Sequence, residues 1–478
     1  MKKILPFIAM LTMHDVLFGQ ALQQEKIDSV CVLVKKYFNA KDVGNLYALA
    51  GDAFQKQLPA ATFKQVCDNN LFPLGEMKDV QFESFTGGVS KYKAVFAAVN
   101  LSLYLSLDKD DKIQEFLFQP YKDDNAKKTV NPPFSNPLVT PLDKKVDSIL
   151  QPFIMQLNTV GVSIAVLKGG KVYYYGYGET AKGSRQVPSQ NTIFEIGSIS
   201  KTFTATLLAD AVNKGKISLD DPLNKYLPDS IPPIEYEGVP VTIRSMINHS
   251  SGIPRMPDNY DFNGADPYKE YDDSKMFSFY KHFTPTRKVG DKYEYSNLAV
   301  GTIGVILERI NKDNYEDMLF KTITQPLGMH DTREYLRAQD SARFAKGYDD
   351  GQYAAPWNFE AFMGAGGIRS TAADLIKYAA AQLGNAPAPL EKDIQLTHIP
   401  TFTTQQATVA MAWHIIKPGK DEVLFHNGGT GGYRSYLAIN LQKKFAVVML
   451  SNTTISVDEL GNALMKWLEN NFSDNFIR

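Results

Sequence analysis

The sequence predicts an α+β protein of two domains, a small α+β domain followed by a larger one with an antiparallel sheet flanked by helices. Helical patterns precede strand patterns over residues 22–121, and strand patterns occur at both ends of residues 142–478 around a helical middle. Residues 122–141 are polar, contain four prolines and lack periodicity, which is typical of a linker. We expect the two ends of the larger domain to form one sheet, with a helical lobe beside it and a site in the cleft between them.

The first residues, 1–21, have the pattern of a secretory signal peptide. Lys2 and Lys3 precede an apolar run over residues 4–13, which is too short to span a bilayer. We expect cleavage near Gln20 or Ala21 and therefore a soluble periplasmic or secreted protein. No cysteine follows the run closely enough for a lipoprotein anchor, so no stable membrane anchor is expected.

The small domain is predicted to begin with helices and to end with a hairpin-built sheet. Helical patterns are followed by strand patterns over 92–107 and 112–119, joined by the turn Asp108-Lys-Asp-Asp. Both cysteines of the chain, Cys31 and Cys67, lie in this domain. They could pair as a disulfide in an exported protein, or remain two buried free thiols.

The larger domain, 142–478, is predicted to open with a helix and a hairpin. The hairpin strands, 162–167 and 172–177, are joined by Gly169-Gly170. Helical patterns dominate the middle of the domain. The predicted elements that follow are helices 298–311 and 372–383, strands 410–416, 422–426, 434–440 and 445–451, and helix 457–470.

Composition excludes several classes of function. The net charge is −1 and charges of both signs are interleaved, so the chain lacks an electrostatic footprint for nucleic acid. No cysteine follows Cys67, which excludes thiol catalysis and cysteine-ligated zinc in the larger domain.

The histidines have no metal-ligand spacing, and no metal or organic cofactor is expected. His249, before Ser250 and Ser251, could indicate a serine triad, but the chain has no Gly-x-Ser-x-Gly elbow.

Ser198 and Lys201 are three residues apart, where a strand pattern gives way to a long apolar helix. On a helix this spacing brings the amine within reach of the hydroxyl, and a lysine in a dry pocket can be the base that serine needs. Ser-x-x-Lys also begins at Ser90, Ser106 and Ser278, but the first two fall in strand patterns and the third in an aromatic packing stripe. The alternative is that Ser198 only caps the helix.

Two further segments accompany this motif in the larger domain. Tyr293-Glu-Tyr-Ser-Asn297 precedes a helix, and His426-Asn-Gly-Gly-Thr-Gly-Gly-Tyr433 ends a strand. In this order the three segments resemble the active-site motifs of serine β-lactamases and penicillin-binding proteins, most closely the class C branch with its esterase and D-peptidase relatives. The resemblance covers residues 142–467 and implies the β-lactamase/transpeptidase-like fold. Residues 22–121 more loosely resemble a nuclear-transport-factor-2-like domain of unknown role.

Acyl transfer gives four of these residues their expected roles. Ser198 attacks a carbonyl group and Lys201 relays its proton. Tyr295, as a phenolate or strongly hydrogen-bonded by Lys201, moves a proton to the leaving group. Asn297 orients Lys201 or a substrate amide. The alternative for Tyr295 and Asn297 is that they cap the following helix.

The third motif supplies substrate contacts. The amide of Ser198 is one donor of an oxyanion hole, the resemblance implies Gly429 for the other, and Gly428 lets substrate approach the backbone. A plain hairpin turn is the alternative for this glycine run. The β-lactamases usually carry lysine where this chain has His426, and a neutral histidine should weaken carboxylate recognition. We expect that recognition to strengthen as the pH falls through about 6.5.

The sequence therefore predicts an exported serine hydrolase that acts through an acyl-enzyme on an ester or amide. Its substrate is a small molecule or a peptide, and an esterase or D-peptidase is favoured over a β-lactamase. The alternative is a non-catalytic or slowly deacylating sensor of penicillin or peptidoglycan fragments. A proton relay argues against a mere binder, which does not need one. The oligomeric state stays open.

Overall fold

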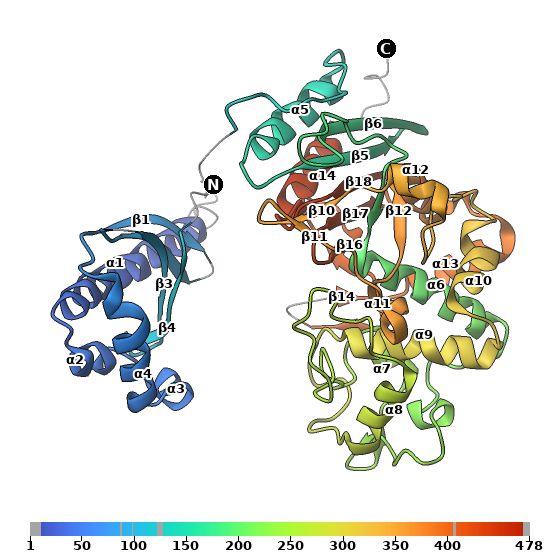
Figure 1. Cartoon of the computed structure of the whole chain (residues 1–478). Coiled ribbons are helices and arrows are strands. Elements are labelled where there is room, and N and C mark those ends of the chain that lie inside the picture. The colour runs from blue at the N-terminus through green and yellow to red at the C-terminus, as the bar shows by residue number, and fades with distance from the viewer. Residues whose placement is uncertain (1–10, 87, 98, 122–127, 405–407, 472–478) are drawn as a thin grey trace, which may run out of the picture. The chain divides into compact units, whose positions relative to one another are not determined.

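The computed structural model describes residues 11–86, 88–97, 99–121, 128–404 and 408–471, with side chains from residue 23 onward. The chain divides into two units, Met1–Asn125 and Ala126–Arg478 (Figure 1). Helix α1, Leu11–Asn39, begins within the expected signal peptide, whose first ten residues lie outside the described part. In the described residues, no helix combines the length and apolar character needed to cross a bilayer.

The first unit places helices against a four-stranded antiparallel sheet with the strands in sequence order. Figure 1 shows α1 lying across one face of this sheet. Ile27, Cys31, Val34 and Phe38 recur at helical spacing on α1 and are buried in its core. The other elements are α2 Val43–Ala48, α3 Asp52–Gln57, α4 Ala60–Val66, η1 Cys67–Leu71, η2 Phe72–Leu74, β1 Asp79–Thr86, β2 Val89–Val95, β3 Asn100–Leu107 and β4 Ile113–Pro120.

Two expectations for this unit are settled by the structure. Cys31 and Cys67 are buried free thiols, and burial raises the pKa of the Cys31 thiol to about 12. The strand expected over 92–107 is two strands, because the backbone reverses after β2, where the Phe96 amide donates to the Val99 carbonyl.

In the second unit an eight-stranded antiparallel sheet joins both ends of the domain, as predicted. Its order is β13-β14-β15-β16-β17-β18-β5-β6, and β18 pairs with β5 in the register Met449↔Ile164. Alternate side chains cover the two faces: Val447 and Met449 pack toward α5 and α14, whereas Val448 and Leu450 belong to the larger core with α6 and α12. Figure 1 shows the lobe of α7, α8 and α9 on the opposite side of the unit from α5 and α14.

The strands of the sheet are β5 Gly161–Lys168, β6 Lys171–Gly178, β13 Phe402–Thr403, β14 Thr408–Val409, β15 His414–Ile416, β16 Val423–Gly429, β17 Arg434–Asn440 and β18 Phe445–Ser451. The α-helices are α5 Pro141–Ile154, α6 Ser200–Asn213, α7 Ile243–Ile247, α8 Asp273–His282, α9 Asn297–Asn311, α10 Tyr315–Leu319, α11 Met363–Gly366, α12 Ala372–Ala380, α13 Ala388–Thr397 and α14 Asp458–Asn470. The short elements are β7 Ile193–Glu195, β8 Glu235–Tyr236, β9 Val239–Pro240, β10 Gly347–Asp349, β11 Gln352–Ala354, β12 Arg369–Thr371, η3 Gly197–Ile199, η4 Leu223–Tyr226, η5 Phe320–Thr324, η6 Ala338–Arg343, η7 Glu360–Phe362 and η8 Ala381–Asn385.

The strand expected over 410–416 is also interrupted. Ala412 has a φ of +60° and the Ala410 amide donates to the Trp413 carbonyl, which makes a tight turn between β14 and β15. Trp413 is fully buried beneath this turn. Burial of the Trp413 indole thus explains why the apolar run 410–416, which has the pattern of a single strand, turns at Ala412.

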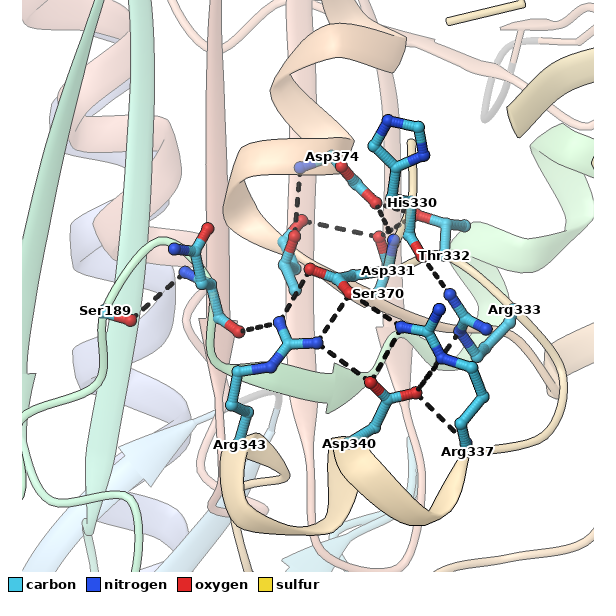
Figure 2. A network of polar contacts seen from close by, with 12 residues as sticks. Ser189, His330, Asp331, Thr332, Arg333, Arg337, Asp340, Arg343, Ser370 and Asp374 are labelled. Atoms are coloured by element: carbon cyan, nitrogen blue, oxygen red, sulfur yellow. Dashed lines mark hydrogen bonds and ion pairs between the residues drawn. The ribbon is translucent and has the colours of Figure 1, made fainter. Parts of the chain in front are cut away.

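An ion network centred on the buried Asp340 adjoins the strand pair β7–β12. Asp340 is fully buried and accepts hydrogen bonds from Arg337 and Arg343, which Figure 2 shows converging on it. The bond from Arg337 holds the pKa of Asp340 at about 2. The neighbouring Arg333 exchanges backbone hydrogen bonds of 2.9 and 2.8 Å with Arg369 on β12. Because β7 pairs with β12, this network supports the strand that leads to Ser198.

Most of the expected linker belongs to the second unit. The Gly178 amide donates to Pro133, the Ser135 amide donates to Gly176, and Lys128 donates through Nζ to the Ile154 and Thr159 carbonyls. These contacts add an extended segment along the edge strand β6. Proline has no amide hydrogen to donate and is therefore tolerated at the edge of a sheet. The same prolines give this segment the sequence pattern of a linker.

We therefore predict that a chain starting at Ala126 folds on its own, whereas one starting at Asn136 is less stable by a few kcal/mol. The shorter chain loses the hydrogen bonds of Lys128, Pro133 and Ser135, each worth about 1 kcal/mol. Urea unfolding of both truncated chains checks this. Equal stability of the two would contradict the structural role of residues 128–135.

Candidate active site

Ser198 sits on a sharp turn between β7 and α6. Gly197 has a φ of +49°, and a Cβ there would lie 2.7 Å from the amide nitrogen of Gly429. Ser200 Oγ donates to the Gly197 carbonyl at 2.7 Å and accepts from the Ile368 amide at 3.1 Å, which fixes the turn. The N-cap of α6 makes no side-chain capping bond, so Ser198 is not its cap. Its hydroxyl is left to face the cleft.

Lys201 is fully buried and has three polar contacts. Its Nζ lies 3.0 Å from Ser198 Oγ, 2.8 Å from Asn297 Oδ1 and 2.6 Å from the Ala365 carbonyl oxygen. The last two atoms are acceptors only. A charged ammonium donates to all three oxygens, whereas a neutral amine gives its two hydrogens to these two acceptors and keeps its lone pair for the Ser198 hydroxyl. The contacts thus match an amine that can take the proton of Ser198.

The charge states of Lys201 and Tyr295 follow from burial. Desolvation, with a smaller effect of Arg255, lowers the pKa of Lys201 well below 10.5. Desolvation also raises the pKa of Tyr295, although a hydrogen bond with Ser198 opposes the shift. The structure therefore favours a neutral amine beside a protonated phenol over the expected phenolate. Lys201 Nζ lies 4.8 Å from the centroid of the Tyr295 ring.

Tyr295 and Asn297 do not cap α9. The N-cap is Ser296, whose Oγ accepts from the Ala299 amide at 2.9 Å and donates to the Pro254 carbonyl at 2.7 Å. This cap leaves the side chains on either side free to point at Lys201 and Ser198. The alternative that Tyr295 and Asn297 only cap the following helix is therefore wrong for both residues.

Gly428 and Gly429 belong to strand β16 and not to a turn. They pair with Ser435 and Arg434 on β17, and the reversal comes afterwards, where the Thr430 amide donates to the Tyr433 carbonyl. A Cβ at Gly428 would lie 2.1 Å from the Ile196 carbonyl and 2.9 Å from the Ser198 amide nitrogen. Only glycine allows this approach, which brings the two expected oxyanion donors to the same place.

An open cleft of about 690 Å³ surrounds Ser198. Tyr295 and the Gly428–Gly429 strand line it beside the hydroxyl, and Arg255, Trp357 and Arg434 line the rest of its wall. Arg434 is half-buried and donates to the Thr430 and Tyr433 carbonyls. The cleft lies between the sheet and the helical lobe, as predicted from the sequence.

Three histidines that appeared scattered in sequence gather around Tyr295. The rings of His249, His414 and His426 lie 4.4, 6.4 and 6.4 Å from the Tyr295 ring. His414 Nε2 makes a 2.7 Å hydrogen bond with Tyr293 Oη. Burial lowers the pKa of His414 to about 4. The spacing of His249 and His414 in the sequence carries no signal for this cluster.

The structure changes the expectation for His426. Its side chain is only 1% exposed and its Nδ1 contacts the Asn427 carbonyl at 2.6 Å. Burial lowers the pKa of His426 well below 6.5. The change in carboxylate recognition expected near pH 6.5 is therefore wrong: this ring stays neutral there and does not carry the charge that a lysine would.

Comparison with known proteins fits this geometry. The sequence model of the beta-lactamase family matches residues 143–468. The chain belongs to the beta-lactamase family. This family member is 30% identical over 356 residues to a β-lactamase of Pseudomonas fluorescens, covering 66% of this chain and 94% of that one. It is 26% identical over 321 residues to the D-alanyl-D-alanine-carboxypeptidase/endopeptidase AmpH of Escherichia coli, covering 62% and 81%.

Solved structures agree with the family assignment. A class C β-lactamase matches with a TM-score of 0.61 and 28% identity, covering 69% of this chain and 97% of that one. The β-lactamase/transpeptidase-like fold predicted from the sequence is therefore confirmed, and the protein is a serine hydrolase.

Proposed function

We propose that the protein cleaves an ester or amide bond through an acyl-enzyme on Ser198. The observation that carries this proposal is the set of contacts of Lys201, whose two acceptor partners leave its lone pair for the Ser198 hydroxyl. Ser198 Oγ attacks the carbonyl carbon while its proton passes to Lys201. The amides of Ser198 and Gly429 bind the oxyanion.

The second half of the reaction involves Tyr295. As a protonated phenol beside Ser198, it donates its proton to the leaving group when the carbon–heteroatom bond breaks, and Lys201 restores that proton. Asn297 positions Lys201 through its Oδ1. In deacylation, water gives its proton to the same relay, attacks the acyl carbon and releases Ser198.

The substrate is proposed to be a small molecule or a peptide. The relatives named above are a β-lactamase and a D-alanyl-D-alanine-carboxypeptidase/endopeptidase. A buried, neutral His426 in place of a charged residue favours an ester, amide or D-peptide over a β-lactam. We also propose an exported protein, cleaved near Gln20 or Ala21, in which the first unit is a nuclear-transport-factor-2-like domain without catalytic residues.

The test is mass spectrometry of the intact protein treated with a fluorophosphonate, followed by a chromogenic panel of short esters, D-amino-acid amides and a cephalosporin. One adduct is expected, on the peptide that contains Ser198, together with continuous turnover of an ester or amide. An adduct on Ser251 would overturn the assignment of the nucleophile. A stoichiometric burst without further turnover would instead favour a slowly deacylating sensor.

A further inference from the structure

We propose that Arg255 selects substrates with an anionic group, a carboxylate above all, on the leaving-group side of the scissile bond. This inference rests on the proposed acyl transfer and names the substrate class of that site. It starts from the charges that line the cleft. Neutral His426 leaves the third motif without a cation, so an anionic substrate must find its positive charge elsewhere in the cleft.

Arg255 is held at the edge of the site by its backbone. Its carbonyl oxygen accepts from the amides of Asn297 and Leu298 at 3.1 and 3.2 Å, at the start of α9. The preceding Pro254 carbonyl accepts from Ser296 Oγ. The segment that presents Arg255 is therefore bonded directly to the segment that presents Tyr295 and Asn297.

The guanidinium group of Arg255 is exposed and lines the cleft. Its Cζ lies 5.1 Å from the centroid of the Tyr295 ring, in a cation–π contact. Among the described residues, no carboxylate lies within ion-pair distance of this group. Its donors thus face a space in which a planar, doubly accepting anion can bind in bidentate fashion.

The other basic groups of the cleft are already engaged by the protein. Arg434 donates to two backbone carbonyls, and Asp349 and Asp458 lie close enough to influence its charge. Lys201 is buried and directs its lone pair at Ser198. Arg255 is therefore the basic residue of this cleft whose guanidinium makes no hydrogen bond or ion pair with the described residues, so all its donors are available to a ligand.

The position of Arg255 also indicates which part of the substrate carries the anion. Tyr295, over whose ring the guanidinium lies, is the group that protonates the leaving group in the proposed reaction. An anion bound by Arg255 therefore belongs to the leaving group. A peptide that loses a C-terminal residue, or an ester of a hydroxy acid, has this arrangement.

The test compares two esters with the same acyl group, one with lactic acid and the other with lactamide as the leaving group. In the wild-type protein we expect the higher kcat/KM for the lactic acid ester. Arg255→Gln should lower the ratio of the two kcat/KM values about ten- to hundredfold, and Arg255→Lys should lower it less. Arg244→Gln, an exposed arginine paired with Asp220, is the matched control and should leave the ratio unchanged.

A second measurement does not need turnover. Binding of 3-carboxyphenylboronic acid and of its carboxamide, measured by calorimetry, should show the same dependence on Arg255. An unchanged ratio of kcat/KM or of affinities in Arg255→Gln would overturn the role of Arg255. If neither ester is hydrolysed while the carboxylated boronic acid still binds through Arg255, the hydrolytic function fails and the anion site stands.

Discussion

Lys201→Met is expected to slow the acylation of Ser198 by about 10³- to 10⁴-fold in a protein that remains folded. Methionine fills a similar volume but has no lone pair to take the Ser198 proton and no donors for Asn297 and Ala365. Because serine and base act as one unit, Ser198→Ala and the double variant should reach nearly the same residual rate as Lys201→Met. Stopped-flow measurement of fluorophosphonate labelling and of ester turnover checks this.

The chain offers a matched control for this variant. Ser278 and Lys281 have the same spacing on α8, but both side chains are exposed. Lys281→Met should label and turn over at the wild-type rate, because Ser278 and Lys281 are not part of the lining of the cleft. Wild-type labelling in Lys201→Met would show that another group takes the proton, and Tyr295 would be the next candidate.

The pairing of Ser198 with Lys201 could be predicted because it is local: residues three apart on a helix share a face. The contact of Lys201 with Asn297 spans 96 residues and could be expected only from the order of the three motifs. The Ala365 carbonyl could not be predicted at all. Every residue has a backbone carbonyl, so residue type does not indicate which one acts as an acceptor. Only the packing of α11 against α6 brings the Ala365 carbonyl to the amine of Lys201.

The burial of His426 could have been predicted from the alternation of side chains between the two faces of a strand. His426 and Gly428 are two residues apart on β16 and share the face that packs on the Ser198 turn, while Asn427 points to the other face. The role expected for His426 came instead from the lysine that β-lactamases usually carry at this position. The histidine cluster around Tyr295 joins His414 on β15 and His426 on β16 to His249 in a loop, and Arg255 also lies in a loop. These segments meet only in the folded chain, so no spacing rule predicts the cluster or the cleft position of Arg255.

Arg369→Met is expected to lower the free energy of unfolding of the second unit by about 3 to 5 kcal/mol. Arg369 is buried on β12 and donates to Glu195 Oε1 at 3.3 Å and to the Trp357 carbonyl at 2.8 Å. Burial already raises the pKa of Glu195, and Arg369 opposes that shift. Without Arg369, the carboxylate of Glu195 would be buried and uncompensated, two residues before Gly197.

The control for this loss is Arg244, whose exposed ion pair with Asp220 should contribute no more than about 1 kcal/mol. Urea unfolding of Arg369→Met, Arg244→Met and the double variant Glu195→Gln/Arg369→Met measures each free energy of unfolding. The double variant should recover part of the stability, because glutamine keeps an acceptor for the Trp357 amide without a buried charge. Equal losses in the single and double variants would show that the lost stability comes from the Trp357 and Glu334 carbonyl contacts of Arg369, and not from the charge of Glu195.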